Sequence, residues 1–174
     1  QTLTPFLLTY FENTLTLNGQ EIAPTSYPIL LAPLKQNEYR FVESEHELKK
    51  SSQSILLDSI ASKIAISTSW FGEYQLFYYI DSSNLLVCSS YETAVDFLRA
   101  RSIALEVDEV AVWEYLVFEH PLRSRTLCRQ IKKIMLGKKM EFSLKPLSLK
   151  ITSSYTLRYS DSYGSSDEEK LTAQ

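Results

Sequence analysis

The fold of this chain is decided by residues 64–92, which read IAISTSWFGEYQLFYYIDSSNLLVCSSYE. Three apolar runs, at residues 64–68, 76–79 and 85–88, are rich in β-branched and aromatic side chains and are separated by turn residues such as Gly72. That composition predicts three strands. Residues 89–92 then predict the start of a helix, and its inward face is expected to carry Ala94, Val95, Phe97 and Leu98.

A second helix is predicted to begin after Asp108. Asp is a favourable N-cap residue, and Glu109 adds negative charge at the positive end of the helix. Apolar residues recur at helical spacing along this segment, at Val110, Trp113, Leu116 and Val117. The spacing predicts an amphipathic helix with one buried stripe, and we expect Trp113 and Tyr115 to pack in the core.

The flanking segments predict further strands, at residues 6–11, 14–17, 39–42, 140–144 and 148–151. Turns are predicted at Asn18-Gly19 and at Lys145-Pro146. Three prolines, the last of them Pro33, interrupt the apolar run before residue 39, so we expect an edge strand or an extended segment there. From residue 160 the composition becomes polar, which predicts one domain over residues 1–159 and a linker over residues 160–174.

Composition and charge exclude several classes of function. The chain has 174 residues, enough for one domain with a sizeable core. A net charge of −3 and a pI near 5.5 give no electrostatic case for binding nucleic acid or an anionic membrane. No apolar stretch is long enough to span a bilayer and no secretion signal is visible, so we expect a cytoplasmic location.

Cysteine and histidine are scarce in this chain. The two cysteines are Cys88 and Cys128, and the two histidines are His46 and His120. Cys88 ends an apolar strand, which favours a buried, inert thiol, and a disulfide with Cys128 is the alternative. No cluster of these residues has the spacing of metal ligands, so we expect no metal site.

Four short segments follow one another at residues 70–79 (WFGEYQLFYY), 90–94 (SYETA), 107–116 (VDEVAVWEYL) and 125–137 (RTLCRQIKKIMLG). In order and interval they resemble motifs in the N-terminal glutamine-amidotransferase-like domain of the asparagine synthetase family. The β-lactam-forming and lasso-peptide macrolactam synthetases are relatives in that family. The resemblance covers roughly residues 64 to 145.

The resemblance implies an α+β fold of the Ntn-hydrolase type, shortened at its N-terminus. In that fold, a four-layer αββα sandwich, two antiparallel sheets lie between layers of helices. The resemblance also implies a partner, an ATP-dependent amide-forming synthetase domain, in the same chain or in a separate one. ATP and Mg are the expected cofactors of that domain, with none in this chain, and a homodimer is a further expectation.

The same resemblance implies that this chain has no catalytic residue. Active domains of the family use an N-terminal Cys, whose free amine is the base for the thiol, whereas residue 1 is Gln. Asn18 and Gly19 resemble part of the family's glutamine-binding Asn-Gly-Glu, with a plain hairpin turn as the alternative. Glu45 resembles an acidic residue that helps to hold the substrate amine.

Three functions are compatible with these residues. The first is a degenerate, non-hydrolytic domain that supports an amide-forming synthetase. The second is a working class II glutaminase domain whose N-terminal Cys is missing from residues 1–174. The third is a free-standing protein-interaction module with tyrosines of residues 74–79 on its surface, for which the alternative is that these tyrosines pack between the sheets.

Overall fold

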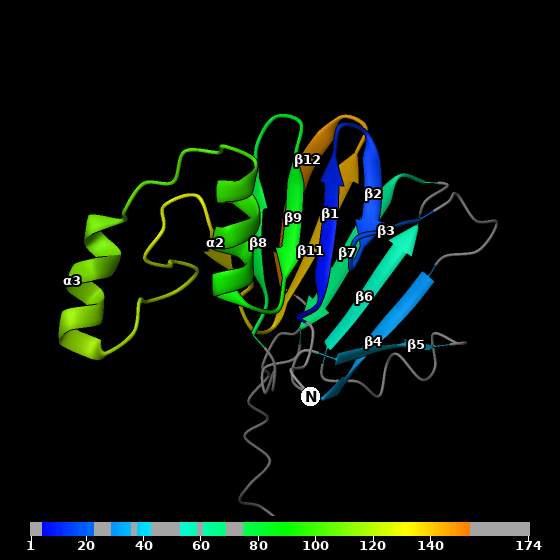
Figure 1. Cartoon of the computed structure of the whole chain (residues 1–174). Coiled ribbons are helices and arrows are strands. Elements are labelled where there is room, and N and C mark those ends of the chain that lie inside the picture. The colour runs from blue at the N-terminus through cyan, green and yellow to red at the C-terminus, as the bar shows by residue number, and fades with distance from the viewer. Residues whose placement is uncertain are drawn as a thin grey trace, which may run out of the picture.

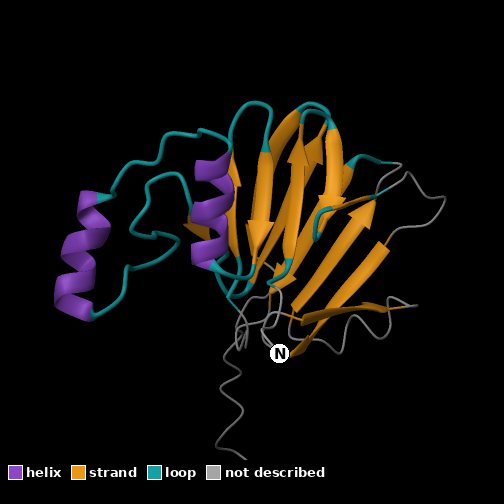
Figure 2. Ribbon diagram, in the orientation of Figure 1, coloured by secondary structure: helices purple, strands orange, loops and turns teal. Residues whose placement is uncertain are grey.

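A computed structural model describes residues 5–22, 29–35, 38–42, 53–58, 61–68 and 75–153. Within these residues the chain has an α+β fold with two antiparallel sheets and two helices (Figure 1; Figure 2). The predicted fold class is therefore confirmed at this level. One helix, α2, covers the outer face of one sheet, and no helix of the described residues covers the outer face of the other. The arrangement in four layers stays a prediction.

The first sheet contains six strands, in the order β10 (Lys132–Lys133), β8 (Phe77–Ile80), β9 (Leu85–Cys88), β1 (Leu7–Phe11), β2 (Thr14–Leu17) and β3 (Gln20–Glu21). Two-residue turns join β1 to β2 and β2 to β3. In the second turn Asn18 and Gly19 both have positive φ, 51° and 81°, as a type I′ hairpin requires. The predicted Asn18-Gly19 turn is confirmed.

The second sheet also contains six strands, in the order β12 (Leu147–Ser153), β11 (Lys138–Leu144), β7 (Lys63–Thr68), β6 (Gln53–Asp58), β4 (Ile29–Lys35) and β5 (Glu38–Val42). The expectation of an edge strand before residue 39 is wrong, because β4 pairs with β5 on one side and with β6 on the other. Pro33 is tolerated there because only residues 29–31 pair with β6, and the β5 pairing is irregular between Pro33 and Lys35.

The main core lies between the two sheets. Successive side chains of a strand point to opposite faces, so β1 directs Leu8 and Tyr10 into this core. Ile64, Ile66 and Phe142 of the second sheet are fully buried opposite them. The rings of Tyr78 and Phe142 meet across the interface with centroids 6.0 Å apart.

Helix α2 (Tyr91–Ala100) closes a second, smaller core on the outer face of the first sheet. Its N-cap is Ser90, whose hydroxyl oxygen accepts a hydrogen bond from the Thr93 backbone N–H at 3.2 Å. Ala94 and Leu98 are fully buried against that sheet, and Val95 and Phe97 are half-buried beside them. The predicted inward face of this helix is confirmed.

Helix α3 (Glu109–Phe118) begins where it was predicted but does not pack as predicted. Asp108 is the N-cap, and its carboxylate accepts a hydrogen bond from the Ala111 N–H at 3.2 Å. The expected buried stripe, with Trp113 and Tyr115 in the core, is wrong: Trp113 is 69% exposed and Ala111 is the one buried residue of the helix. Apolar residues lie on every side of α3, so their spacing does not define one inward face.

The described domain ends with β12 at Ser153. The predicted linker at residues 160–174, the Gly72 turn and Glu45 all lie outside the described residues.

The inter-sheet core predicts a large effect for one substitution. Phe142→Ala removes a fully buried ring and leaves a cavity between the sheets, so we expect the free energy of unfolding to fall by about 3–5 kcal/mol. Ile151→Ala on the neighbouring strand β12 is the control, because Ile151 is exposed and its truncation should change stability by less than about 1 kcal/mol. Urea denaturation followed by circular dichroism measures both, and equal losses would contradict the core assignment.

Candidate functional site: the exposed helix α3 and the cavity beside α2

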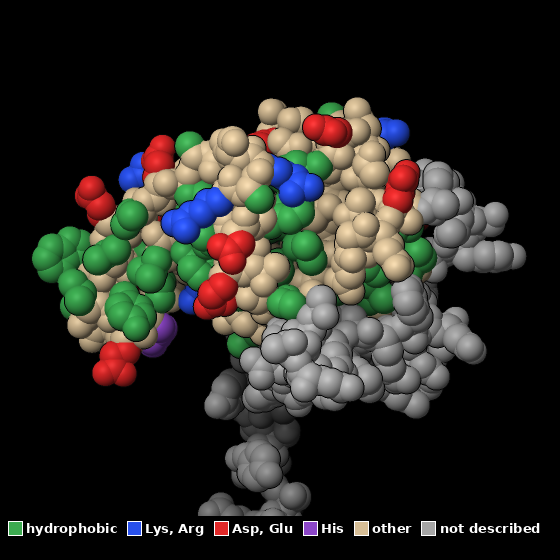
Figure 3. Space-filling model, viewed as in Figure 1, with side chains coloured by type: hydrophobic (Ala, Val, Ile, Leu, Met, Phe, Trp, Pro, Cys, Tyr) green, Lys and Arg blue, Asp and Glu red, His purple; other side chains and the backbone are tan. Residues whose placement is uncertain are grey.

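Helix α3 carries a large exposed apolar surface. It stands away from the sheets, and apolar side chains gather on it in the space-filling view (Figure 1; Figure 3). We define the α3 surface as its six large exposed apolar residues: Val110, Trp113, Tyr115, Leu116, Val117 and Phe118. Helices with apolar residues on all sides are normally buried. The composition of α3 therefore indicates that another protein surface covers it.

Polar contacts fix the position of α3. The Asp108 backbone N–H donates to the Leu127 carbonyl at 2.9 Å, which ties the start of the helix to the loop at residues 119–131. From the middle of the helix, Glu114 forms an ion pair with Arg125 and accepts a hydrogen bond from the Leu122 N–H at 2.9 Å. The α3 surface is therefore held in place without being buried.

An apolar hollow of about 230 Å³ lies at the base of α3, between Tyr115 and Phe77 of the first sheet. Lys133 closes one side of it and donates from Nζ to the Pro121 carbonyl at 2.8 Å. Partial burial lowers the pKa of Lys133 against the opposing effect of Glu114. The hollow continues the apolar character of the α3 surface toward the body of the domain.

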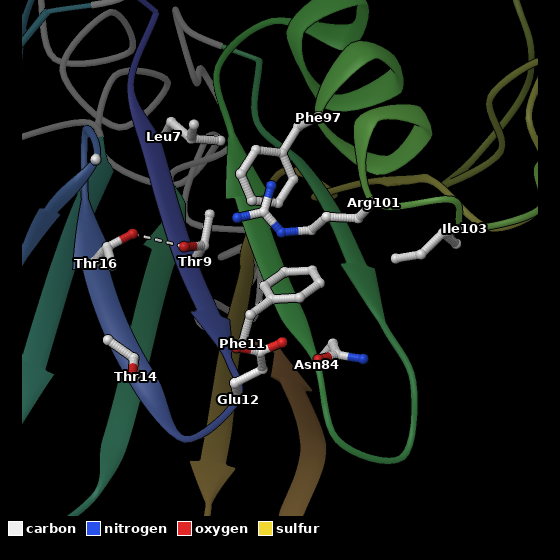
Figure 4. A pocket seen from close by; sticks show the side chains of 11 residues that line it. Leu7, Thr9, Phe11, Glu12, Thr14, Thr16, Asn84, Phe97, Arg101 and Ile103 are labelled. Carbon is white, nitrogen blue, oxygen red and sulfur yellow. Dashed lines mark hydrogen bonds between the residues drawn. The ribbon is translucent and has the colours of Figure 1, made fainter.

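A second, more polar cavity of about 560 Å³ opens beside α2, on the outer face of the first sheet; we call it the α2 cavity (Figure 4). Its floor comes from β1 and β2, because the residues of β1 that alternate with the inter-sheet core face outward here. Those residues are Leu7, Thr9 and Phe11, and β2 adds Thr14 and Thr16. Phe97 of α2 and Arg101, its C-cap residue, form the wall above them.

The Arg101 guanidinium is stacked on two aromatic rings at this cavity. Its central carbon lies 3.7 Å from the ring centroid of Phe97 and 5.0 Å from that of Phe11 (Figure 4). Such cation–π contacts contribute about 0.5–1 kcal/mol each at an exposed site. They orient a positive charge at the mouth of the cavity.

Asn18 and Gly19, the residues predicted to bind substrate that the structure describes, form the turn between β2 and β3. Gly19 lines the α2 cavity, whereas the side-chain oxygen of Asn18 accepts a hydrogen bond from the Leu7 N–H at 2.8 Å. That bond, with the Asn18 N–H donating to the Leu7 carbonyl at 2.7 Å, ties the turn to the start of β1. Asn18 therefore has a structural role in the hairpin.

Sequence reasoning did not assign Arg101, Phe97 or the outward threonines to a binding site. A local signal was present, because Phe97 and Arg101 are four residues apart and therefore lie on one face at the end of α2. The partner ring, Phe11, is some ninety residues away in the sequence, so only the pairing of β1 with β9 brings it to this place.

The tyrosines and cysteines singled out in the sequence are buried. Tyr78 packs between the sheets and Tyr79 packs under α2, with its hydroxyl donating to Asp81. Tyr74 lies outside the described residues. Cys88 and Cys128 are both buried and free, so the alternative of a disulfide between them is wrong.

Across the described ranges, no three His, Cys, Asp or Glu side chains come together in a group that could hold a metal ion. Neither α2 nor α3 is long and apolar enough to cross a membrane. No protein-family model matches the chain, and no curated protein matches it.

The environment of the cysteines predicts low thiol reactivity. Burial raises the pKa of the Cys88 thiol, so the reactive thiolate forms only at higher pH than in an exposed cysteine. We expect neither thiol to react with an aromatic disulfide reagent at neutral pH in the native protein, and both to react in guanidinium chloride. Absorbance of the released thiolate measures this. Rapid labelling of the native protein, located by mass spectrometry, would contradict the burial.

Proposed function

We propose that this chain is a non-hydrolytic, amidotransferase-like domain that binds, through the α3 surface, to an ATP-dependent amide-forming synthetase domain. The observation that carries the proposal is the exposure of α3, whose Trp113 and Leu116 side chains are 69% and 67% exposed. Burying a fully exposed apolar side chain of this size contributes about 1.5–3 kcal/mol. Three of the six residues, Trp113, Tyr115 and Phe118, are aromatic, a residue type enriched at the buried centre of protein interfaces.

The identity of the partner rests on where the family resemblance falls. Of the four matching segments, residues 107–116 include most of α3, and residues 125–137 include the end of the loop bound to it and strand β10. In the family that these segments resemble, a domain of this kind is joined to a synthetase domain. The apolar surface and the resemblance therefore favour the same partner. ATP and Mg would belong to that domain, and its use of ATP fits a cytoplasmic location.

The two antiparallel sheets, packed face to face with α2 on one outer face, are compatible with the four-layer αββα arrangement.

The non-hydrolytic part of the proposal is supported by the burial of the two thiols of the chain. Cys88 is fully buried in the strand under α2, and Cys128 is buried beside it in the same core. A nucleophile for glutamine must reach the substrate amide and have a base within hydrogen-bond distance.

The two alternative functions, a protein-interaction module and a working glutaminase, can be distinguished from the proposed one. Tyr78 and Tyr79 are buried, so an interaction module would have to use the α3 surface instead of the tyrosines of residues 74–79. That surface also supports a homodimer, which is one outcome of the binding test below. A working glutaminase is the outcome tested by hydrolysis.

Incubation with glutamine tests the absence of hydrolysis. We expect glutamate release no faster than in a sample without protein, because neither buried thiol can attack the substrate. Release that requires this protein would contradict the proposal and favour a working glutaminase. A double variant, Cys88→Ser with Cys128→Ser, serves as the control, since release that it abolishes must come from a thiol of this chain.

A second experiment tests the α3 surface. The coding sequence beside this chain, in the same or a neighbouring gene, should specify an ATP-dependent synthetase domain, and the absence of such a domain would contradict the proposal.

The double substitution Trp113→Ser with Leu116→Ser should weaken binding of that domain at least about tenfold, because central apolar anchors dominate interface energies. Ile151→Ser is the matched control, exposed but on β12. Calorimetry measures affinity, and analytical ultracentrifugation detects self-association. An unchanged affinity, or a homodimer that excludes the synthetase domain, would reject this surface.

A further inference from the structure

We infer that the α2 cavity is a binding site for a small organic carboxylate with an apolar body. This site lies on the outer face of the first sheet and does not depend on the function proposed above. Its volume, about 560 Å³, falls within the range of small-molecule sites, about 300–1,000 Å³. The inference rests on the hydrogen-bond donors that line it and on the charge at its mouth.

The first donor group is the Arg101 guanidinium. The Phe97 and Phe11 rings contact its faces, so the N–H groups at its edge remain available (Figure 4). Among the described residues no carboxylate lies within ion-pair distance of Arg101. A stacked guanidinium with free edges is suited to bidentate recognition of a carboxylate.

The second donor group is a pair of threonine hydroxyls on the cavity floor. The Thr9 and Thr16 oxygens are 2.6 Å apart and share one hydrogen bond (Figure 4). Two hydroxyls carry two protons, and their mutual bond uses one of them. The other proton, on either hydroxyl, is left to donate to solvent or to a ligand in the cavity, because Thr9 is 3% exposed and Thr16 is half-buried. An anionic oxygen of a ligand can accept this hydrogen bond.

The other residues that line the α2 cavity indicate which kind of anion it would bind. Leu7, Phe11 and Ile103 offer an apolar wall, which suits a ligand with an apolar body. Glu12 also lines the cavity, and its negative charge disfavours phosphate and other multiply charged anions. A singly charged carboxylate can reach Arg101 at a smaller electrostatic cost.

A purely structural role for Arg101 is the competing explanation. As the C-cap residue of α2, it places positive charge at the negative end of the helix dipole, which stabilises a helix by itself. Arg99 lies in the last turn of the same helix and supplies the same kind of charge, but it does not line the cavity. The two arginines therefore separate ligand binding from helix stabilisation.

The experiment is a titration with benzoate, followed by nuclear magnetic resonance of the backbone amides. We expect saturable shifts centred on Thr9, Thr16 and Arg101. Arg101→Gln should weaken benzoate binding about tenfold or more, since a hydrogen bond to a charged group contributes about 1.5–3 kcal/mol. Arg99→Gln should leave the affinity within about twofold of the original, because screened surface charges interact weakly. Both variants should fold, because the cap of α2 uses the backbone N–H of residue 101.

Neutral and inorganic probes complete the test. Benzamide has the shape of benzoate without its charge, and inorganic phosphate has charge without an apolar body, so both should bind more weakly than benzoate. The inference is overturned if benzoate gives no saturable shifts, or if its shifts lie outside the cavity. It is also overturned if benzamide or phosphate binds as tightly as benzoate, or if Arg99→Gln and Arg101→Gln weaken binding equally.

Discussion

Strand β9 buries both of its faces, and the rest of the architecture is arranged around that constraint. All four of its residues, Leu85 to Cys88, are fully buried. Leu85 and Val87 enter the core between the sheets, and Leu86 and Cys88 enter the core under α2. A strand of this kind needs a pairing strand at each edge and a packing layer on each face. Strands β1 and β8, the second sheet and α2 fill these four positions.

Sequence reasoning predicted these strands and the starts of both helices well, because the signals for them are local. Apolar runs predicted strands at residues 64–68, 76–79 and 85–88, and residues 89–92 predicted the start of α2. The same reasoning failed for α3, where helix formation was predicted correctly but burial was not. Propensity and capping act within the helix, whereas burial requires a second surface, and the residues of α3 carry no information on whether that surface belongs to the same domain. The strand that contains Pro33 was mispredicted for a similar reason. Proline predicts an edge strand, but β4 pairs with β6 through residues 29–31, and the sequence of β4 does not show this pairing.

The candidate sites show a similar division. The residues taken from the family resemblance include Asn18, whose side chain holds the hairpin together. Arg101, which lines the α2 cavity, has no motif around it, and strands from the start of the chain create its environment. Sites assembled across an antiparallel sheet are not visible as spacing along the sequence. They become visible only when the register, here Leu7 opposite Cys88, is fixed.

The double burial of β9 has a consequence for the motions of the domain. Displacing this strand to loosen the core under α2 would also pull Leu85 and Val87 out of the core between the sheets. We therefore expect the two cores to exchange amide hydrogens as one cooperative unit, at close to the full unfolding free energy. Helix α3 contributes to neither core, so we expect its amide hydrogens to exchange faster than those of the sheets. The orientation of α3 relative to the sheets is set by the contacts of Asp108 and Glu114 with the loop at residues 119–131.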